Sequence, residues 1–341
     1  MKKVLVNSNY SILNKNGNIF NRVGDKSISR FLDQMKSLEQ SGLEHGISFQ
    51  TIHSLSIHEA DGFFLIDMPK DNDPMLKRIK KINKPKFLYT WESPLINERN
   101  HNTEALEIFD LVFTFNEDLV DEKKFLKVNY SFDFPEVSSI QTKNRKLLCS
   151  ISSNRYSYDQ GELYTERRNL IKKCEDKLSK DFDLYGKGWT KKIPPKNIFE
   201  KVFNKFEFIH SSYPSEFTSY RGEVRSKDFI LEKYRFSICY ENFEGEKGYI
   251  SEKIFDSFFA LNVPIYLGEK NIENFIPQKC FIDRKKFSSD EDIINFIKEM
   301  GNFEYETFIK NIRNFILEQK GGNFSNQGFC KKIISNILEK I

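Results

Sequence analysis

The stretch of sequence that decides the fold reads YRFSICYENFEGEKGYISEKIFDSFFALNVPIYLG and runs from Tyr234 to Gly268. It begins with an apolar run, passes through a polar loop, and ends with an amphipathic segment and a second apolar run. This order predicts a strand at Tyr234–Tyr240, a helix from about Tyr249 to Leu261, and a strand at Val263–Leu267. A helix that joins two such strands is typical of a parallel sheet.

The rest of the chain alternates short apolar runs with segments of helical period in the same way. Residues 27–38 show the helical pattern, with Ser27 placed as an N-cap and apolar residues recurring on one face behind it. This alternation predicts an α/β fold in which helices cover parallel sheets and ligands bind at the carboxyl ends of strands. Further strands are expected at 3–7, 47–53, 62–67, 86–91, 111–115, 147–151 and 182–185, and further helices at 74–81, 102–109 and 162–178.

Length and a change in composition together indicate two domains. The chain has 341 residues, which is more than twice the roughly 150 of a typical domain. A polar stretch at 136–146 is followed directly by a new apolar strand, as expected for a linker. We therefore expect Rossmann-like domains at 1–140 and 147–320 that face each other across a cleft, followed by a C-terminal helix at 321–341.

Composition and charge narrow the partners that the chain could have. The 53 Lys and Arg exceed the 49 Asp and Glu by only four, which is not the basic stripe that duplex binding needs, so no nucleic-acid partner is expected. No apolar window approaches the ~18 residues that span a bilayer. The five cysteines are widely spaced within apolar runs, which predicts buried thiols and a cytoplasmic protein.

The last twelve residues, 330–341, form an amphipathic segment with lysines on its polar side. Such a segment fits a packed terminal helix, and the same pattern would also suit a peripheral contact with a membrane surface. The sequence leaves both interpretations open.

The polar loop and helix start inside the deciding stretch have the chemistry of an anion site. The apolar face of the predicted helix places Ser251, Glu252 and Lys253 in its first turn, where unpaired amides and the helix dipole favour negative charge. Lys253 is placed to meet a phosphate, and Glu252 could accept hydrogen bonds from ribose or sugar hydroxyls. Asn242 and Tyr249 line the same loop. The alternative is an ordinary capped helix start whose charged side chains are solvated.

This pattern resembles a known family. Tyr234-Arg-Phe, Tyr240-Glu-Asn, Gly248-Tyr-Ile-Ser-Glu-Lys-Ile and Val263-Pro-Ile-Tyr-Leu-Gly follow one another as in the donor-binding signature of the α1,3/α1,4-fucosyltransferases, glycosyltransferase family 10, and of its bacterial members in particular. Upstream, Leu88-Tyr-Thr-Trp-Glu-Ser-Pro is similar to the family's Glu-Ser-Pro element. Glu166-Arg-Arg-Asn is similar to the start of the family's donor domain.

The resemblance implies a GT-B enzyme that transfers L-fucose from GDP-fucose to a sugar hydroxyl with inversion and without an essential metal or other cofactor. The implied acceptor hydroxyl is O3 of N-acetylglucosamine or glucose in an oligosaccharide or glycolipid, such as a precursor of a bacterial surface polysaccharide. A cytoplasmic enzyme could meet such an acceptor peripherally, at the inner membrane face.

Site residues follow from combining the resemblance with the chemistry of each side chain. Glu92 ends an apolar strand beside Trp91, where partial desolvation could raise its basicity, and we expect it to be the general base. Lys253 and either Arg167 or Arg168 would neutralise the departing diphosphate in place of a metal ion. The sequence does not choose between the two arginines. The expected donor-binding residues are Arg167, Arg168, Asn242, Tyr249, Glu252 and Lys253.

Three alternatives remain at this stage. A metal-dependent GT-A transferase could use Asp71-Asn-Asp73 to hold a divalent cation, although similar triplets also occur at 181–183 and 290–292. The donor could be a different GDP-sugar. A non-enzymatic protein could use its aromatic residues and lysines to bind carbohydrate or nucleic acid.

Overall fold

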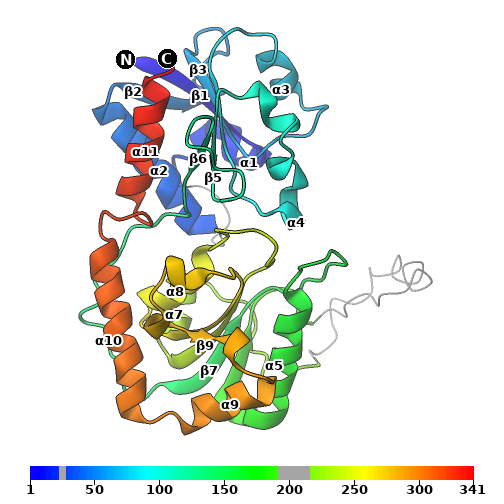
Figure 1. The fold of residues 1–341 in the computed structure, drawn as a ribbon, viewed down its shortest axis with the longest axis vertical. Helices are drawn as coiled ribbons and strands as arrows, with labels where there is room; N and C mark the ends of the chain where they lie inside the picture. Colours follow the sequence, from blue (N-terminus) through cyan, green and yellow to red (C-terminus); the bar gives the residue numbers. More distant parts are fainter. Residues whose placement is uncertain (23–27, 191–215) are drawn as a thin grey trace, which may run out of the picture. The chain divides into compact units, whose positions relative to one another are not determined.

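The computed structural model describes residues 1–22, 28–190 and 216–341, and the chain divides into two compact units (Figure 1). Unit 1 comprises Met1–Phe134, Glu246–Tyr249 and Leu317–Ile341, and unit 2 comprises Pro135–Gly245 and Ile250–Ile316. Ser27, expected as an N-cap, lies outside the described residues. Each unit is built around one parallel sheet, as the alternating sequence pattern predicts.

Unit 1 contains a six-stranded sheet of order β2-β1-β3-β4-β5-β6, in which every pair is parallel. Successive residues of β3 point to opposite faces, so that Phe63 and Leu65 enter one core cluster while Phe64 and Ile66 enter the other. Burial on both faces explains why this strand is a continuous apolar run. The strands are β1 (Lys2–Ser8), β2 (Ile47–Thr51), β3 (Gly62–Ile66), β4 (Lys86–Tyr89), β5 (Leu111–Thr114) and β6 (Phe125–Lys127).

Helices cover the sheet of unit 1. The core cluster on one face includes the predicted apolar residues of α2, and the cluster on the other includes Leu76 and Ile79 of α3. Residues 102–109 were expected to form a helix, but only Ala105–Ile108 are helical there, as one short 3-10 segment. The helices are α1 (Ser11–Asn14), α2 (Ser29–Glu44), α3 (Pro74–Ile79), α4 (Pro94–Asn97) and α11 (Asn326–Leu338), with a 3-10 segment at Glu98–His101.

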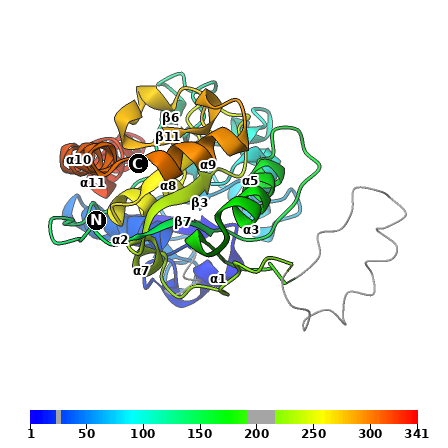
Figure 2. The ribbon, with the colours of Figure 1, turned by 90° about the horizontal axis from the view of Figure 1, so that it is seen from below.

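Unit 2 contains a five-stranded sheet of order β11-β10-β9-β7-β8, which is also parallel throughout. Helices α5 and α9 lie side by side in both ribbon views (Figures 1 and 2). The strands are β7 (Lys146–Ile151), β8 (Phe182–Tyr185), β9 (Tyr234–Tyr240), β10 (Val263–Leu267) and β11 (Ile282–Asp283). The helices are α5 (Tyr164–Leu178), α7 (Lys227–Leu231), α8 (Glu252–Phe259), α9 (Asp290–Glu299) and α10 (Asn302–Gln319).

Each sheet has one point at which the chain reverses its direction of travel across the strands. In unit 1 the chain goes from β1 to β2 and then to β3 on the other side of β1. In unit 2 it goes from β7 to β8 and then to β9 on the other side of β7. Ligands of open parallel sheets bind at the carboxyl ends of the strands beside such a reversal. The two places to search for a site are therefore the carboxyl ends of β1 and β3, and those of β7 and β9.

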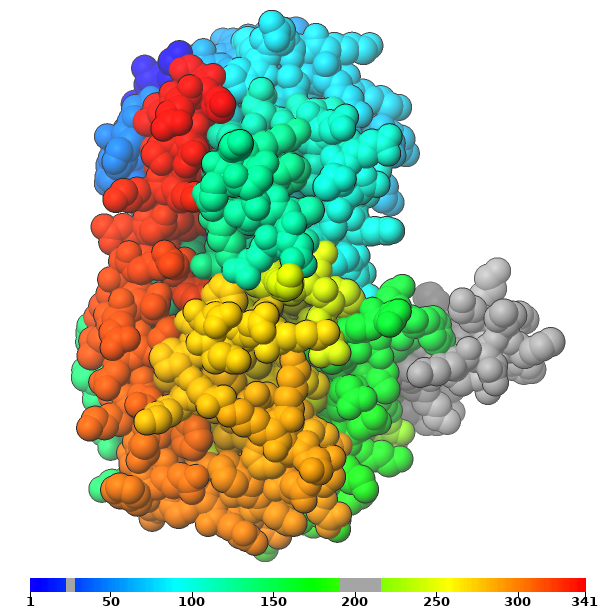
Figure 3. Space-filling model, viewed as in Figure 1, coloured from blue at the N-terminus to red at the C-terminus, as the bar shows by residue number. Residues whose placement is uncertain are grey.

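The C-terminal helix α11 packs into unit 1. Its residues Phe329, Cys330, Ile333, Ile334 and Ile337 are buried in the same core cluster as α2. The red surface of α11 lies beside the blue surface of α2 in Figure 3. The apolar face of α11 is therefore covered by protein, as expected for a packed terminal helix. No helix in the described part of the chain is long and apolar enough to cross a bilayer.

The segment Glu246–Tyr249 belongs to unit 1, although the expected boundaries placed it inside the second domain. Gly248 packs so closely that a Cβ atom there would lie 2.3 Å from the Phe115 carbonyl oxygen, and its φ is +85°. Only glycine fits this approach. The preceding residue, Lys247, accepts a backbone hydrogen bond of 3.1 Å from Glu117. Because these residues pack in unit 1, α8 begins at Glu252, three residues later than expected.

Candidate active site

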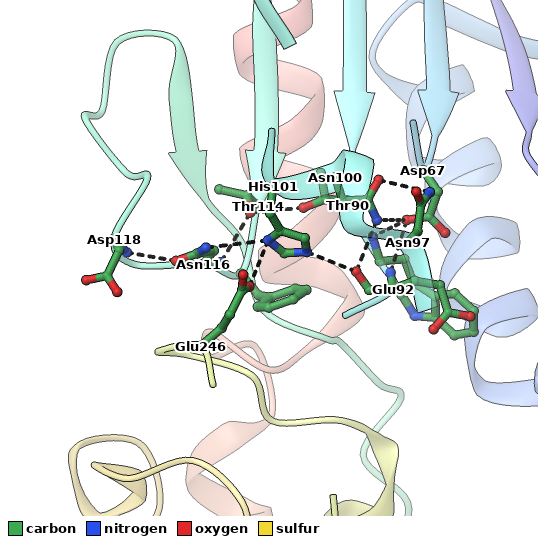
Figure 4. A network of polar contacts seen from close by, with 12 residues as sticks. Asp67, Thr90, Glu92, Asn97, Asn100, His101, Thr114, Asn116, Asp118 and Glu246 are labelled. Atoms are coloured by element: carbon green, nitrogen blue, oxygen red, sulfur yellow. Dashed lines mark hydrogen bonds and ion pairs between the residues drawn. The ribbon is translucent and has the colours of Figure 1, made fainter. Parts of the chain in front are cut away.

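Glu92 lies at the carboxyl edge of the unit 1 sheet, two strands from β1 (Figure 4). The tyrosine that follows β1, Tyr10, donates a hydrogen bond from its phenol to Glu92 Oε1. Trp91 stacks on Phe31 with ring centroids 4.5 Å apart, and it meets the edge of Tyr10 at 6.5 Å. The expected base is therefore half-buried beside aromatic rings, at the edge where the topology predicts a ligand.

Asp67, directly after β3, anchors the backbone that carries Glu92. Its Oδ1 accepts hydrogen bonds from the backbone N–H groups of Trp91 at 2.7 Å and Glu92 at 3.0 Å, and from Asn100 Nδ2 at 2.7 Å. Its φ of +60° turns the chain sharply at the end of the strand. Burial raises the pKa of Asp67, and the three hydrogen bonds oppose that rise. Its Oδ2 is buried and has no hydrogen-bond partner among the described residues.

Two side chains hold the carbonyl group of Glu92 from the opposite side. Asn100 Nδ2 lies 3.0 Å from the Glu92 carbonyl oxygen, and His101 Nε2 lies 3.3 Å from it. The other ring nitrogen of His101 faces Glu246, with 2.7 Å between Nδ1 and Oε2. Figure 4 shows His101 between Glu92 and Glu246. The sequence did not predict the roles of Tyr10, Asp67, Asn100, His101 and Glu246. Only Asp67 had a signal, an acidic residue at the end of a buried strand.

At the carboxyl edge of the unit 2 sheet, a buried carboxylate binds the residues that start α8. Glu241, directly after β9, is fully buried and accepts hydrogen bonds from Ser251 N at 2.8 Å and Ser251 Oγ at 2.6 Å. Lys253 Nζ lies 3.0 Å from Glu241 Oε2 and 2.9 Å from Ser251 Oγ. Gly268, after β10, leaves room for Glu241, because a Cβ atom there would lie 2.5 Å from Glu241 Cγ. The ammonium group of Lys253 is thus fixed at the first turn of the helix.

Glu252 contacts a second lysine, Lys227, which was not predicted from the sequence. Lys227 Nζ lies 2.7 Å from Asp256 and 3.4 Å from Glu252. Burial raises the pKa of Glu252, but the charges of Lys253 and Lys227 outweigh it and lower the pKa to about 2. Burial lowers the pKa of Lys227, and its two carboxylate neighbours raise it to a larger extent. Glu252 is therefore an ionised hydrogen-bond acceptor at the start of α8.

The structure distinguishes the two arginines that the sequence left open. Arg167 is 5% exposed, donates to the Tyr240 carbonyl oxygen at 3.2 Å, and has its pKa lowered by burial. Arg168 is more accessible; its side chain is 26% exposed and pairs with Glu216. It also donates to Asn154 Oδ1 at 2.6 Å. Of the two, Arg168 is the guanidinium that a ligand could reach by displacing the side chain of Glu216.

The two remaining donor-site candidates lie in different units. Asn242 is half-buried at the end of β9, and its carbonyl oxygen accepts a hydrogen bond of 3.0 Å from Leu163 N. Tyr249 is buried in unit 1, where its ring lies 5.2 Å from that of Phe115 and 6.2 Å from that of Tyr130. Unit 2 therefore brings together Arg167, Arg168, Asn242, Glu252 and Lys253, and unit 1 contains Glu92 and Tyr249.

The aspartates that might have held a metal ion have other roles. Asp71 forms a two-pronged ion pair with Arg99, with both N–O distances 2.7 Å, and Asp73 caps α3 through Leu76 N at 2.8 Å. Asp183 is bound by Lys146, Arg221 and Tyr234. Across residues 1–22, 28–190 and 216–341, no group of three or more His, Cys, Asp or Glu side chains could hold a metal ion. The aspartates of the GT-A alternative are thus accounted for by structural contacts.

Comparison with solved structures identifies the type of fold. An α1,3-fucosyltransferase crystallised with GDP matches over 99% of this chain and 90% of its own, with a TM-score of 0.54 and 17% identity. Anabaena HepE in complex with UDP-glucose matches over the whole of both chains, with a TM-score of 0.56 and 10% identity. At these identities the match concerns the fold alone. The fold is the two-sheet GT-B architecture expected from the sequence, and the GT-A alternative is wrong.

Sequence comparison identifies relatives of the chain. An α-(1,3)-fucosyltransferase of Helicobacter pylori is 30% identical over 105 residues, which are 31% of this chain and 22% of the relative. An α-(1,4)-fucosyltransferase of Arabidopsis thaliana is 29% identical over 114 residues, or 32% of this chain and 28% of the relative. A 4-galactosyl-N-acetylglucosaminide 3-α-L-fucosyltransferase of Rattus norvegicus is 24% identical over 253 residues, or 73% of this chain and 56% of the relative.

The chain thus aligns with less than a third of the first two relatives and with just over half of the third. Residues 140–335 match the family described as glycosyltransferase family 10 (fucosyltransferase), C-terminal part. This match covers more than half of the chain, including β9, α8 and every donor-site candidate in unit 2. The chain belongs to glycosyltransferase family 10.

Proposed function

We propose that the protein is a fucosyltransferase that moves L-fucose from GDP-fucose to a hydroxyl group of a glycan, with inversion at the sugar. The observation that carries this proposal is the family 10 match over residues 140–335, which includes the start of α8 where Glu241 fixes Lys253. The family supplies the reaction class, and the anchored lysine supplies a cation suited to a sugar diphosphate.

Inversion in one step requires a base for the attacking hydroxyl. As the acceptor oxygen bonds to the fucose C1 atom, the C1–O bond to the β-phosphate breaks and its electron pair leaves with GDP. The proton of the hydroxyl goes to a carboxylate, and we assign this role to Glu92. Its support is its place at the carboxyl edge of the unit 1 sheet, with its backbone held by Asp67. A positioned base of this kind contributes about 10² to 10⁴ in rate.

The leaving diphosphate requires positive charge. Among the described residues of unit 2, Lys253 and Arg168 suit this role, because both are partly exposed. Lys253 lies in the first turn of α8, and Arg168 lies near the start of α5 and binds Asn154. Glu252 is suited to accept hydrogen bonds from hydroxyl groups of the ribose or of the fucose. With these residues in place the reaction needs no metal ion, and we propose that none is required.

The acceptor we propose is O3 of N-acetylglucosamine or glucose in a bacterial surface glycan. This proposal is supported by the names of the relatives, one of which is a 4-galactosyl-N-acetylglucosaminide 3-α-L-fucosyltransferase. The donor and the acceptor are proposed on separate grounds, so each can be tested independently.

The test is an assay of the purified chain with GDP-fucose, GDP-mannose and UDP-glucose against an array of glycan acceptors, with and without excess EDTA. We expect transfer from GDP-fucose alone, unchanged by EDTA, with a new bond at O3. Transfer from GDP-mannose but not from GDP-fucose would overturn the donor assignment. Activity that EDTA abolishes would overturn the metal-independent mechanism.

Substitution of Glu92 tests the assignment of the base. Glu92→Gln keeps the size and the hydrogen-bonding reach of the side chain but abolishes its basicity, so kcat should fall by about 10² to 10⁴. The affinity for GDP measured by calorimetry should stay within a factor of two. Glu98→Gln, on an exposed residue of the nearby 3-10 segment, is the matched control and should retain full activity. If Glu92→Gln keeps its kcat, the base is elsewhere.

A further inference from the structure

The backbone of Glu92 is restrained on both sides of its Cα atom. Asp67 Oδ1 accepts the hydrogen of the N–H group, while Asn100 and His101 approach the carbonyl oxygen at 3.0 and 3.3 Å. The carboxylate of Glu92 extends from a backbone that these contacts hold in one orientation. Any residue that fixes His101 therefore contributes to the placement of Glu92.

His101 is itself fixed by a residue that comes from far along the chain. Its side chain is 9% exposed, and Glu246 Oε2, with 14% of that side chain exposed, lies 2.7 Å from Nδ1, at ion-pair distance but without the alignment of a hydrogen bond. Phe115 packs on the ring with centroids 5.7 Å apart, and Asn116 Nδ2 lies 3.5 Å from Nδ1. Figure 4 shows the ring oriented with one nitrogen toward Glu92 and the other toward Glu246. With its two nitrogens so engaged, the ring cannot rotate without losing one contact.

The Glu246–Tyr249 segment is held against unit 1 by contacts that do not depend on His101. Lys247 pairs with Asp118, and Gly248 approaches the Phe115 carbonyl oxygen at a distance that excludes a side chain. Both side chains of the Lys247–Asp118 pair are more than half exposed, whereas those of His101 and Glu246 are largely covered. The segment therefore carries one largely covered contact, to the histidine that touches the Glu92 carbonyl oxygen, and one exposed ion pair.

We propose that His101 and Glu246 are positioning residues for Glu92. Glu246 orients the imidazole ring, and the ring holds the Glu92 carbonyl oxygen, so that the carboxylate stays aligned with the acceptor hydroxyl. This inference rests on the proposed function, in which Glu92 is the base. A misplacement of about 1 Å can cost on the order of 10²-fold in rate, because proton transfer requires hydrogen-bond distance. The pair acts on the chemical step and not on donor binding.

The test measures kcat, KM for acceptor and donor, GDP affinity and melting temperature for His101→Gln, Glu246→Gln and the double variant. Both single substitutions keep side-chain volume approximately and remove the contact between the imidazole ring and the carboxylate. We expect kcat to fall by about 10- to 100-fold in each, with KM values and GDP affinity within a factor of two. The double variant should be no slower than the slower single variant, because the two residues act as one unit. Asp118→Asn, in the exposed pair of the same segment, is the matched control and should keep wild-type kcat.

The outcomes separate this inference from the proposed function. If Glu92→Gln is inactive while His101→Gln and Glu246→Gln keep wild-type kcat, the positioning role is refuted and the base assignment stands. If Glu92→Gln keeps its activity, the base assignment fails and this inference fails with it. Should His101→Gln not fold, Glu246→Gln alone decides the question. Equal losses of kcat and melting temperature in Asp118→Asn would also overturn the proposal, since they would show a general effect of loosening the segment.

Discussion

The ammonium group of Lys253 serves two needs at the same position. It is the nearest cation to Glu241, a carboxylate with no exposed surface, and it is also the group proposed to meet the diphosphate. A buried carboxylate that loses its charged partner destabilises the fold, so a loss of activity in a Lys253 variant has two possible causes. Separating them requires a change in Glu241 as well.

A double substitution separates the structural role of Lys253 from its proposed binding role. Lys253→Met should lower the free energy of unfolding by roughly 3 kcal/mol and reduce kcat/KM by roughly 2 to 4 kcal/mol of transition-state stabilisation. Adding Glu241→Gln removes the orphaned charge and keeps an acceptor for Ser251 N, so most of the stability should return while kcat/KM stays low. Urea unfolding and initial rates measure the two quantities. Lys270→Met, at an exposed lysine of the same unit, is the control. Recovery of activity together with stability would leave Lys253 with a structural role alone.

At the scale of single residues, the sequence predicted where Glu252 and Lys253 lie better than it predicted their contacts. The first turn of a helix after a polar loop was enough to single out Glu252 and Lys253, because unpaired amides there favour anions whatever the tertiary structure. Glu241 and Lys227, which hold these two side chains, were missed, since their pairing depends on how strands and loops pack. The sequence left Arg167 and Arg168 open for the same reason, because the burial of Arg167 on one face of α5 depends on packing.

The start of α8 is an element whose stability depends on ionised side chains. Glu252 is ionised at an unusually low pH, and it lies in the first turn beside Lys227, with Ser251 as the N-cap. A carboxyl group with a depressed pKa stabilises the fold above its ordinary pKa, and this contribution is lost as the pH falls toward the depressed value. Lys227, whose pKa is raised, keeps its contribution throughout the acidic range and loses it only in strong alkali.

Acid unfolding tests this account of α8. Between about pH 4.5 and pH 2, protonation of Glu252 should remove stabilisation on the order of 1 to 3 kcal/mol, the upper value being reduced by solvent screening of a partly exposed group. Glu252→Gln should therefore be less stable at pH 7 and show a shallower loss of stability in this range. Denaturant titrations at a series of pH values measure it. Glu299→Gln, at an exposed residue of α9, should leave the profile unchanged. Parallel profiles for wild type and Glu252→Gln would contradict the assigned depression of the pKa.

Element ends were harder to predict than element types, and the reason is visible at β4. The apolar run continues to Trp91, and a strand was expected as far as that residue. It ends at Tyr89 because Asp67 takes the N–H groups of Trp91 and Glu92 away from the ladder. The helix expected from Tyr249 begins at Glu252 because Tyr249 packs against Phe115 in unit 1. In both cases a contact distant in sequence overrides the local pattern.

At the scale of the whole molecule, the chain passes between its two units four times. The crossings occur after residues 134, 245, 249 and 316, and only the first lies near the polar stretch that marked a linker in the sequence. The others have no compositional signal, because the returning segments are ordinary amphipathic or polar sequence. Two sheets of parallel strands could be predicted from alternating apolar runs, whereas the return of the last 25 residues, 317–341, to unit 1 could not.

That return makes unit 1 depend on the C-terminus, and α11 provides the test. Ile333 is fully buried in the cluster that also contains Met35 of α2, so Ile333→Ala should cost about 2 to 5 kcal/mol of unfolding free energy. Lys331→Ala, on the exposed face of the same helix, should change stability by less than about 0.5 kcal/mol. Hydrogen exchange should accelerate in β1, β2 and α2 of the Ile333→Ala variant and stay unchanged in β7, β9 and β10.

Shortening the chain to end at residue 316 should remove the protection of the unit 1 sheet altogether. If the shortened chain kept that protection, α11 would be dispensable for the fold, and its apolar face would again be open to a role at a membrane surface.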